Sequence, residues 1–306
     1  VCSSDLLLLV ARALQGLAAA ATWTTGLALL AEGFPSEKRG QAMATVFAAA
    51  NVGVLLGPPV SGLLTESLGP RSPFLLAGAI VLADAVARVL LLGDDESPRG
   101  ERVGLRGLLA DGTVRTLAGA MALGAALWAI LESTLPLHLD SALRTGPKEI
   151  GILFAVAALA HTVTSPVMGR LSDRVGRKKV LLVGYVLAAF LLPVPAFLAS
   201  KGSVGLAMAA LGVTTSFVLS PVSPGLADAV ERMGSRSFGG VFSLVNIAYA
   251  VGMMGGPLLG SALVEAAGIR GALVATSALF ALYLVPLARM APSPRRSAAP
   301  ATIPAP

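Results

Sequence analysis

The sequence predicts an all-α membrane protein. Of its 306 residues, 55% are hydrophobic and only 13% are charged, and the mean hydropathy is +0.79, whereas soluble domains carry about a quarter charged residues. The apolar residues form separate blocks of about twenty, the length that a helix needs to cross about 30 Å of hydrocarbon. The net charge of +6 does not indicate a nucleic-acid partner, because the cations lie in short loops without interleaved aromatic residues.

Nine apolar blocks predict nine membrane-spanning helices. In order, we expect them at residues 7–31, 42–64, 73–92, 116–139, 150–168, 180–199, 204–226, 238–264 and 272–290. The run SPVSPG at 220–225 should break the seventh of them. The longest polar connector, 94–115, divides the chain into three spans within 7–93 and six within 116–290, and the Pro/Ala-rich tail 291–306 is typical of disorder.

Lysine and arginine are distributed unequally between alternate loops. Sixteen lie on the side that holds the connector and the C-terminal tail, and five lie on the other side. Because cytoplasmic loops carry the excess of positive charge, we expect the C-terminus in the cytoplasm, in a multi-pass protein of the inner cell membrane. The single cysteine, Cys2, excludes an internal disulfide.

An internal repeat is found when the chain is shifted by 199 residues. Gly40, Gly53, Gly57, Pro58, Leu64, Glu66, Gly69 and Arg71 then fall on Gly239, Gly252, Gly256, Pro257, Leu263, Glu265, Gly268 and Arg270. Both copies run in the same direction, as in the parallel repeats that relate the halves of some transporters. The spans within 116–199 have no counterpart before the first copy, so we expect a chain that lacks three preceding helices.

The first six residues, VCSSDL, favour the same interpretation. They back-translate to a nucleotide sequence similar to a widely used sequencing adapter, which predicts that residues 1–6 are an artefact. Long-read sequencing of the locus would test this expectation.

Three motifs resemble signatures of the major facilitator superfamily. GRLSDRVGRKK (169–179) is similar to the family's loop signature between its eighth and ninth helices, and ARALQG (11–16) to its Arg-x-x-Gln-Gly signature in the fourth helix. GVLLGPPVSG (53–62) resembles the fifth-helix signature of drug/proton antiporters. The resemblance is strongest to the branch of vesicular amine transporters and bacterial multidrug exporters. It implies a bundle of two six-helix halves, in which the nine helices here are the fourth to the twelfth.

The loop motif contains a possible conformational switch. Its members are Gly169, Asp173, Arg174, Gly176 and Arg177. The glycines permit close approach and turning, and the cations fix orientation. The resemblance implies that Asp173 holds the cytoplasmic side shut, and we expect its carboxylate at the positive N-terminal end of the helix after Pro35, near residues 37–41. The alternative is a loop that only sets orientation, although orientation requires no aspartate.

The antiporter motif consists of Gly53, Gly57, Pro58, Pro59 and Gly62. Small residues let helices pack closely in lipid, and the two prolines should kink the span. The resemblance implies that this helix seals the interface between the halves against leak. Plain close packing is the alternative.

Ionisable residues inside the predicted spans are candidates for a transport site, because they are costly there. Asp84 and Arg88 lie four residues apart and should neutralise each other as a structural pair. Glu132 has no charged partner within one turn of its helix, which suits a group that alternately holds a proton and a cationic substrate. A protonated glutamate bonded to a neighbouring helix is the alternative. The resemblance associates Arg12 with proton coupling.

Three further residues belong to the candidate substrate or proton site. Trp128, one turn before Glu132, suits stacking on a cation, although apolar packing is the more common role. His161 aligns with a pocket-facing position, although an isolated histidine in a bundle is more often a hydrogen-bonded packing residue. Where the resemblance implies acids in the tenth and eleventh helices, the chain has Ser216 and Asn246, which carry no charge.

These residues predict a secondary active transporter that exports amines, drugs or other hydrophobic compounds in exchange for protons, by alternating access. Transport of another solute, such as a sugar or an organic acid, and a fragment that transports nothing are the alternatives. An enzyme has little support, because the chain has two histidines and neither an HExxH nor a G-x-S-x-G motif. We expect no cofactor and no metal; the expected partners are a small-molecule substrate, protons and the bilayer, around a monomer.

Overall fold

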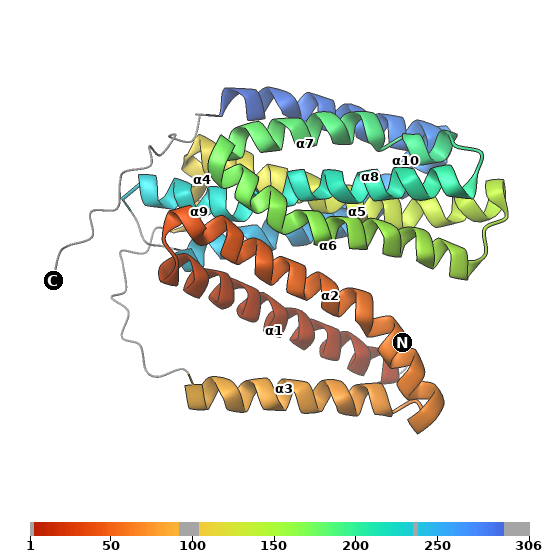
Figure 1. The fold of residues 1–306 in the computed structure, drawn as a ribbon, viewed down its shortest axis with the longest axis horizontal. Coiled ribbons are helices and arrows are strands. Elements are labelled where there is room, and N and C mark those ends of the chain that lie inside the picture. The colour runs from red at the N-terminus through yellow and green to blue at the C-terminus, as the bar shows by residue number, and fades with distance from the viewer. Residues whose placement is uncertain (1–2, 92–103, 235–237, 291–306) are drawn as a thin grey trace.

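The computed structural model describes residues 3–91, 104–234 and 238–290. Within these ranges the chain folds into helices and contains no strand (Figure 1), which confirms the all-α fold that the sequence predicts. Seven helical stretches of the described residues are long and apolar enough to cross a membrane, and the longest, 238–289, spans two of the expected helices. The expected tail 291–306, residues 1–2 and residues 92–103 of the connector region lie outside the described residues.

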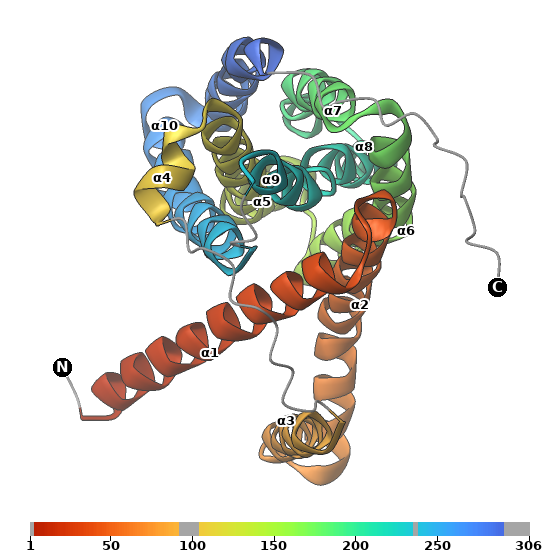
Figure 2. The ribbon, with the colours of Figure 1, turned by 90° about the vertical axis from the view of Figure 1, so that its left-hand side faces the viewer.

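The first three helices are α1 (Ser3–Gly33), α2 (Ser36–Leu68) and α3 (Ser72–Leu91). Pro35 separates α1 from α2, because its fixed φ of −61° suits a helix start and it has no N–H to continue the preceding helix. α2 continues through Pro58 and Pro59 as one helix. Figure 2 shows α1 and α3 extending away from the later helices.

The remaining helices form the packed body of the molecule. They are α4 (Leu105–Ala110), α5 (Gly112–Leu143), α6 (Pro147–Val175), α7 (Arg177–Leu191), the 3₁₀ helix η1 (Val194–Phe197), α8 (Lys201–Leu219), α9 (Val222–Arg232) and α10 (Phe238–Arg289). The break expected in SPVSPG is confirmed, because α8 ends before Ser220 and α9 begins after Pro221. Asp111 caps α5 by accepting a hydrogen bond from the backbone N–H of Val114 at 2.9 Å.

α10 consists of two membrane helices joined at a sharp bend. Its 52 residues would be about 78 Å long as one straight helix, more than twice the hydrocarbon thickness. Gly268 interrupts it with φ 67° and ψ 173°, a conformation open essentially to glycine alone. Gly69, at the equivalent position of the first copy of the repeat, has φ 89° and ψ 169° at the end of α2. The repeat in the sequence is therefore also a repeat in backbone geometry.

α5 lies in the middle of the packed body, in contact with α8, α9 and α10 (Figure 2). Large side chains along it, among them Leu117, Ile130 and Leu139, are almost fully buried. Tyr185 of α7 joins the same core, since its hydroxyl donates to the carbonyl of Ala120 at 2.8 Å. This rigid body positions the loop between α6 and α7 and the face of α5 that carries Glu132.

Candidate functional site

The turn between α6 and α7 carries the loop motif. α6 ends at Val175, and Gly176 then turns the chain with φ 97°, a left-handed value that favours glycine, so that α7 begins at Arg177. Asp173 and Arg177 lie on either side of the turn and form an ion pair. The Nη1 group of Arg177 also donates to the hydroxyl of Ser172 at 2.9 Å. Arg174, in the same turn of α6, is exposed.

The carboxylate of Asp173 lies against the first turns of α2. It fills the space beside Gly40, where a β-carbon would overlap its oxygens, and it interacts with the backbone N–H of Gln41. Gly169 belongs to the same contact, because a β-carbon there would come within 2.8 Å of the β-carbon of Ala44. Asp173 therefore lies where the sequence places it, near residues 37–41, and its role in switching stays a prediction.

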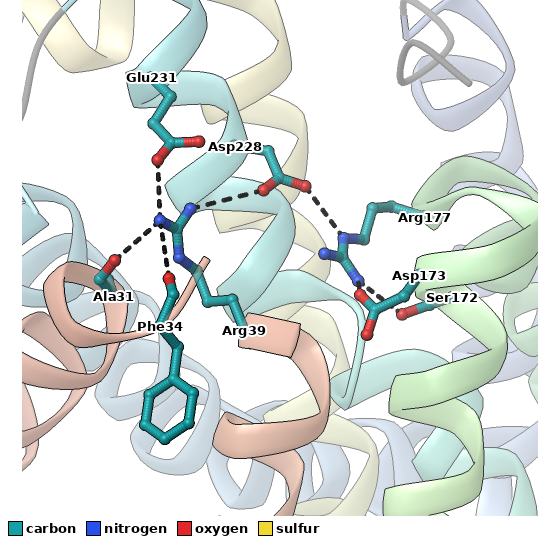
Figure 3. Close-up of polar contacts among 8 residues, drawn as sticks. All are labelled: Ala31, Phe34, Arg39, Ser172, Asp173, Arg177, Asp228 and Glu231. Atoms are coloured by element: carbon teal, nitrogen blue, oxygen red, sulfur yellow. Dashed lines mark hydrogen bonds and ion pairs between the residues drawn. The ribbon is translucent and has the colours of Figure 1, made fainter. Parts of the chain in front are cut away.

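Asp228 of α9 connects this ion pair to a second arginine (Figure 3). Its Oδ2 accepts a hydrogen bond from Nε of Arg177 at 3.1 Å, and its Oδ1 lies 3.8 Å from Nη1 of Arg39 in α2. Arg39 also donates from Nη2 to Glu231 at 2.8 Å. We call Arg39, Asp173, Arg177, Asp228 and Glu231 the ion-pair network. It joins α2 to α6, α7 and α9 at one end of the bundle.

Arg39 is almost completely buried, with 3% of its surface exposed. Its Nη2 donates to the carbonyl of Ala31 at the end of α1, at 2.7 Å (Figure 3). Its guanidinium carbon lies 5.2 Å from the ring centroid of Phe238, at the start of α10. Because breaking a buried ion pair by removing one partner costs about 3–5 kcal/mol, the network favours the arrangement in which this end is closed.

The sequence does not predict the other members of the network. In the sequence analysis, Arg39 is one of the cations that set the orientation in the membrane. Asp228 and Glu231 lie just after the expected end of the seventh span. One feature of the sequence could have indicated an ion-pairing site here: these two acids lie three residues apart, on one face of a helix. Their contact with Arg39, 192 residues away from Glu231, depends on tertiary packing.

Glu132 lies on α5, in the half of the helix remote from the ion-pair network. Its side chain is exposed within the described part of the chain and interacts with the indole N–H of Trp128. Trp128 packs edge-on against Phe154 of α6, with ring centroids 6.0 Å apart. Tyr249 of α10, which the sequence did not single out, is close enough to interact electrostatically with Glu132. A carboxylate beside aromatic rings is an arrangement that suits a cation.

Arg12 and Asn246 have other partners. The Nη1 of Arg12 donates to the side chain of Gln15 at 2.9 Å, within α1. The Nδ2 of Asn246 donates to the hydroxyl of Thr24 at 2.7 Å and so joins α10 to α1. Among the described residues, no hydrogen bond or ion pair connects either of them to Glu132.

His161 of α6 is hydrogen-bonded to α8. Its Nδ1 lies 3.0 Å from the hydroxyl of Ser216, which lies 2.7 Å from the hydroxyl of Thr164. Ser216 is fully buried. These contacts fit the packing interpretation of His161, and they also put its ring beside the position where the resemblance implies an acid.

The second copy of the antiporter repeat packs closely in the structure. In α10, a β-carbon at Gly252 would overlap the carbonyl of Ala122, and one at Gly256 would come within 2.9 Å of the β-carbon of Ala129. Both contacts are with α5. The small residues therefore bring the backbones of α5 and α10 together, as they do between helices in lipid.

The antiporter motif of the first copy, on α2, has no such close approach at its glycines Gly53 and Gly57 in the described part of the chain. A β-carbon at Gly53 or Gly57 would meet nothing within 4 Å. Side-chain contacts of Pro58 and Pro59, and the surroundings of Gly62, lie outside what the structure describes. The role of this motif in sealing the interface between the halves stays a prediction.

Asp84 and Arg88 form the pair that the sequence predicts. The Nε of Arg88 lies 2.7 Å from Oδ2 of Asp84, one turn apart on α3. Both side chains are exposed, and this arrangement explains how α3 carries two ionisable residues with no net charge.

Comparison with known protein families gives the same fold and assigns the chain to one of them. The family described as Major Facilitator Superfamily matches residues 1–119 and 117–305. The chain belongs to the Major Facilitator Superfamily. The two matched segments of this superfamily member meet near the start of α5, where the sequence predicts that the two halves join.

The curated relatives confirm the branch that the motifs indicate. The human chromaffin granule amine transporter is 29% identical over 283 residues, which cover 90% of this chain and 53% of the relative. The Mus musculus synaptic vesicular amine transporter is 28% identical over 87% of this chain and 52% of its own length. The Drosophila melanogaster vesicular acetylcholine transporter is 25% identical over 87% of this chain and 48% of its own length. The chain spans about half the length of the curated relatives it matches.

Solved structures of the same superfamily share the fold. The human organic anion transporter MFSD10 (TETRAN) matches with a TM-score of 0.69 and 20% identity, over 87% of this chain and 67% of its own. The Escherichia coli fucose:proton symporter matches with a TM-score of 0.60 and 16% identity, over 88% of this chain and 73% of its own. Together with the apolar spans, this fold makes the chain part of a multi-pass membrane protein.

Proposed function

We propose that the protein containing this chain is a secondary active transporter that exports amines, drugs or other hydrophobic small molecules in exchange for protons. The observation that carries this proposal is the position of Glu132, an exposed carboxylate on α5 that interacts with Trp128 one turn before it. The names of the relatives, which include amine and acetylcholine transporters, support a cationic substrate.

Glu132 provides the chemistry that exchange requires. Its carboxylate attracts a protonated amine, and an aromatic side chain such as Trp128 close by suits a cation. When the carboxylate binds a proton it loses its charge and with it the attraction for the amine. Proton and amine therefore compete for one group, and each leaves when the other binds.

We assign the ion-pair network to the cytoplasmic end of the transporter, because the excess of lysine and arginine lies in the loops at that end. This orientation leaves the C-terminus in the cytoplasm, in an inner cell membrane. The structure then has its cytoplasmic end closed, and alternating access requires Asp173 and Arg39 to separate from their partners. We assign Arg12 and Asn246 to the α1 side of the transport path and His161 to the α6 side.

The test is export of a fluorescent amine by the complete gene product in inverted membrane vesicles. We expect export to require a proton gradient and to be lost in Glu132→Gln, which keeps the shape of the side chain but not its charge. Glu149→Gln is the matched control, because Glu149 is an exposed carboxylate at the start of α6, paired with Lys201 at 2.6 Å, and should leave export unchanged. Equal export by the Glu132→Gln variant would remove Glu132 from the proposed site.

Transport of another solute is the second candidate, and the replacement of the implied acids by Ser216 and Asn246 favours it. A site with fewer acids binds a cation less strongly. If the vesicles transport a labelled sugar or organic acid and do not transport the amine, the second candidate replaces the first.

A further inference from the structure

A pocket with a volume of about 440 Å³ lies between α5 and α10, at the end of the bundle opposite the ion-pair network. Its polar lining consists of Ser133, Thr134, His138 and Ser141 from α5 and of Ser261 and Glu265 from α10, and three aliphatic side chains complete it. This volume falls within the range of about 300–1,000 Å³ typical of small-molecule sites.

The polar groups of the pocket are mainly hydrogen-bond acceptors. The hydroxyls of Ser133 and Thr134 both donate to the carbonyl of Ile130, at 3.1 and 2.7 Å. The hydroxyl of Ser141 donates to the carbonyl of His138 at 3.1 Å. Because these hydroxyls already donate their hydrogens to carbonyls of their own helix, they can act only as acceptors toward a ligand. A molecule that binds here must therefore bring the donors.

Glu265 gives the pocket a negative charge. Among the described residues it takes part in no ion pair or hydrogen bond. The nearest cation along the chain, Arg270, is engaged elsewhere, since its Nε donates to the carbonyl of Ala196 at 3.2 Å and its guanidinium lies over the ring of Phe197. Glu265 is exposed, so a cation that enters the pocket can reach its carboxylate without displacing a partner among the described residues.

We propose that this pocket binds a protonated amine, with its ammonium group on Glu265 and on the serine and threonine oxygens. An ammonium group supplies positive charge and several N–H donors, and these complement a carboxylate surrounded by acceptors. The aliphatic lining covers the apolar part of the ligand. The proposed function supplies the class of ligand, and the pocket is a second site distinct from Glu132, at the other end of the path from the ion-pair network.

The experiment measures protection of a cysteine in the pocket. In a Cys2→Ser background, Val264→Cys puts one thiol in the lining, and its rate of reaction with a maleimide is followed in the complete protein in nanodiscs. The probe is 2-phenylethylammonium. We expect it to slow labelling saturably, by about tenfold at ten times its Kd, whereas the uncharged 2-phenylethanol should not protect.

Glu265→Gln should raise the Kd of the amine about ten- to a hundredfold, and so remove the protection at the same concentration, since the ammonium group then meets a neutral amide oxygen in place of a charged carboxylate. Glu66→Gln is the matched control, because Glu66 occupies the equivalent position of the first copy of the repeat and does not line this pocket. Ser261→Phe fills the pocket while keeping the charge of Glu265 and should also abolish protection.

Three results would overturn the inference: equal protection in Glu265→Gln, protection by 2-phenylethanol, or protection by Mg²⁺ and not by the amine. The outcome is independent of the test of the proposed function. Glu132→Gln should keep the protection of the pocket cysteine while losing export. If Glu132→Gln abolishes export and Glu265→Gln leaves protection intact, the second site alone is refuted.

Discussion

At the scale of single residues, the network is built from cations that have little access to water. Arg177 is only 4% exposed, and its two ion pairs hold Asp173 and Asp228. Truncation of Arg177 leaves Asp173 without its cation and Asp228 with Arg39 alone. Two like charges at short range repel each other, and partial burial strengthens the repulsion.

We predict that Arg177→Ala opens the closed end. The closed arrangement should lose about 3–5 kcal/mol of stabilising free energy, as for other buried ion pairs that lose one partner. The measurement is the rate of maleimide labelling of Ala44→Cys, in a Cys2→Ser background, because Ala44 is covered by α6 in the closed form. Lys201→Ala is the control, since its ion pair is exposed and should contribute less than about 1 kcal/mol. An unchanged labelling rate in Arg177→Ala would contradict the prediction.

Gly40 allows a second prediction at this scale. Gly40→Ala places a β-carbon in the space that the Asp173 carboxylate occupies, so we expect the same increase in labelling of Ala44→Cys. Gly239→Ala is the matched control, because Gly239 is the repeat equivalent of Gly40 and has open space around it. If both alanine variants label alike, the close approach at Gly40 does not hold the end closed.

The sequence predicts the residues of this site unevenly. Asp173 could be placed near residues 37–41, because a helix start attracts a carboxylate and the loop motif is compact in sequence. Asp228 and Tyr249 could not be found in the same way. The interactions of each depend on a helix that is distant in the sequence. A single sequence does not show which helices are in contact.

At the scale of helices, close packing between α5 and α10 depends on small residues spaced four apart. Gly252, Gly256 and Gly260 of α10 each lie directly against residues of α5. The spacing puts them on one stripe of α10 and lets the two backbones approach. Under the proposed transport cycle, we therefore expect the packed body to move as one piece.

Gly252→Ala should destabilise the protein, by about 1–3 kcal/mol, because the added methyl group has to displace the backbone of α5. Gly255→Ala is the control on the same helix. Its β-carbon meets nothing within 4 Å, and alanine is the better helix former, so stability should stay equal or rise. The measurement is thermal unfolding in detergent. Equal melting temperatures for the two variants would show that α10 does not pack on α5 in this register.

Helix boundaries follow from the sequence where turn chemistry is local. Pro35 and the pair Ser220–Pro221 end helices where the sequence predicts. The kink expected at Pro58 and Pro59 leaves α2 a single helix, since membrane-spanning helices accommodate proline by small local adjustments. The expected gap between the last two spans contains one non-helical residue, Gly268, and so is shorter than apolar patterning can resolve.

At the scale of the whole molecule, α2 and α6 meet across the boundary between the N-terminal part and the packed body. The contact of Gly169 with Ala44 lies at this boundary. Alternating access requires the two sides to separate there. Contacts within the body, such as that of Gly252 with α5, should persist through the cycle.

A disulfide between Ala44→Cys and Gly169→Cys should therefore block transport in a Cys2→Ser background. Oxidation should stop amine export, and reduction should restore it. The control pair, Ala129→Cys with Gly256→Cys, lies wholly within the body, where the β-carbon positions are 2.9 Å apart, and its oxidation should leave export unchanged. Export that continues in the oxidised 44–169 pair would show that this end does not need to open.

Asp228 receives both buried arginines, one on each of its carboxylate oxygens. Each arginine offsets part of the negative charge that attracts the other, so a carboxylate that loses one of them holds the remaining one more strongly. We therefore expect the two arginines to depart one after the other. The second contact then acts as a tether between α9 and its neighbours while the first is already broken.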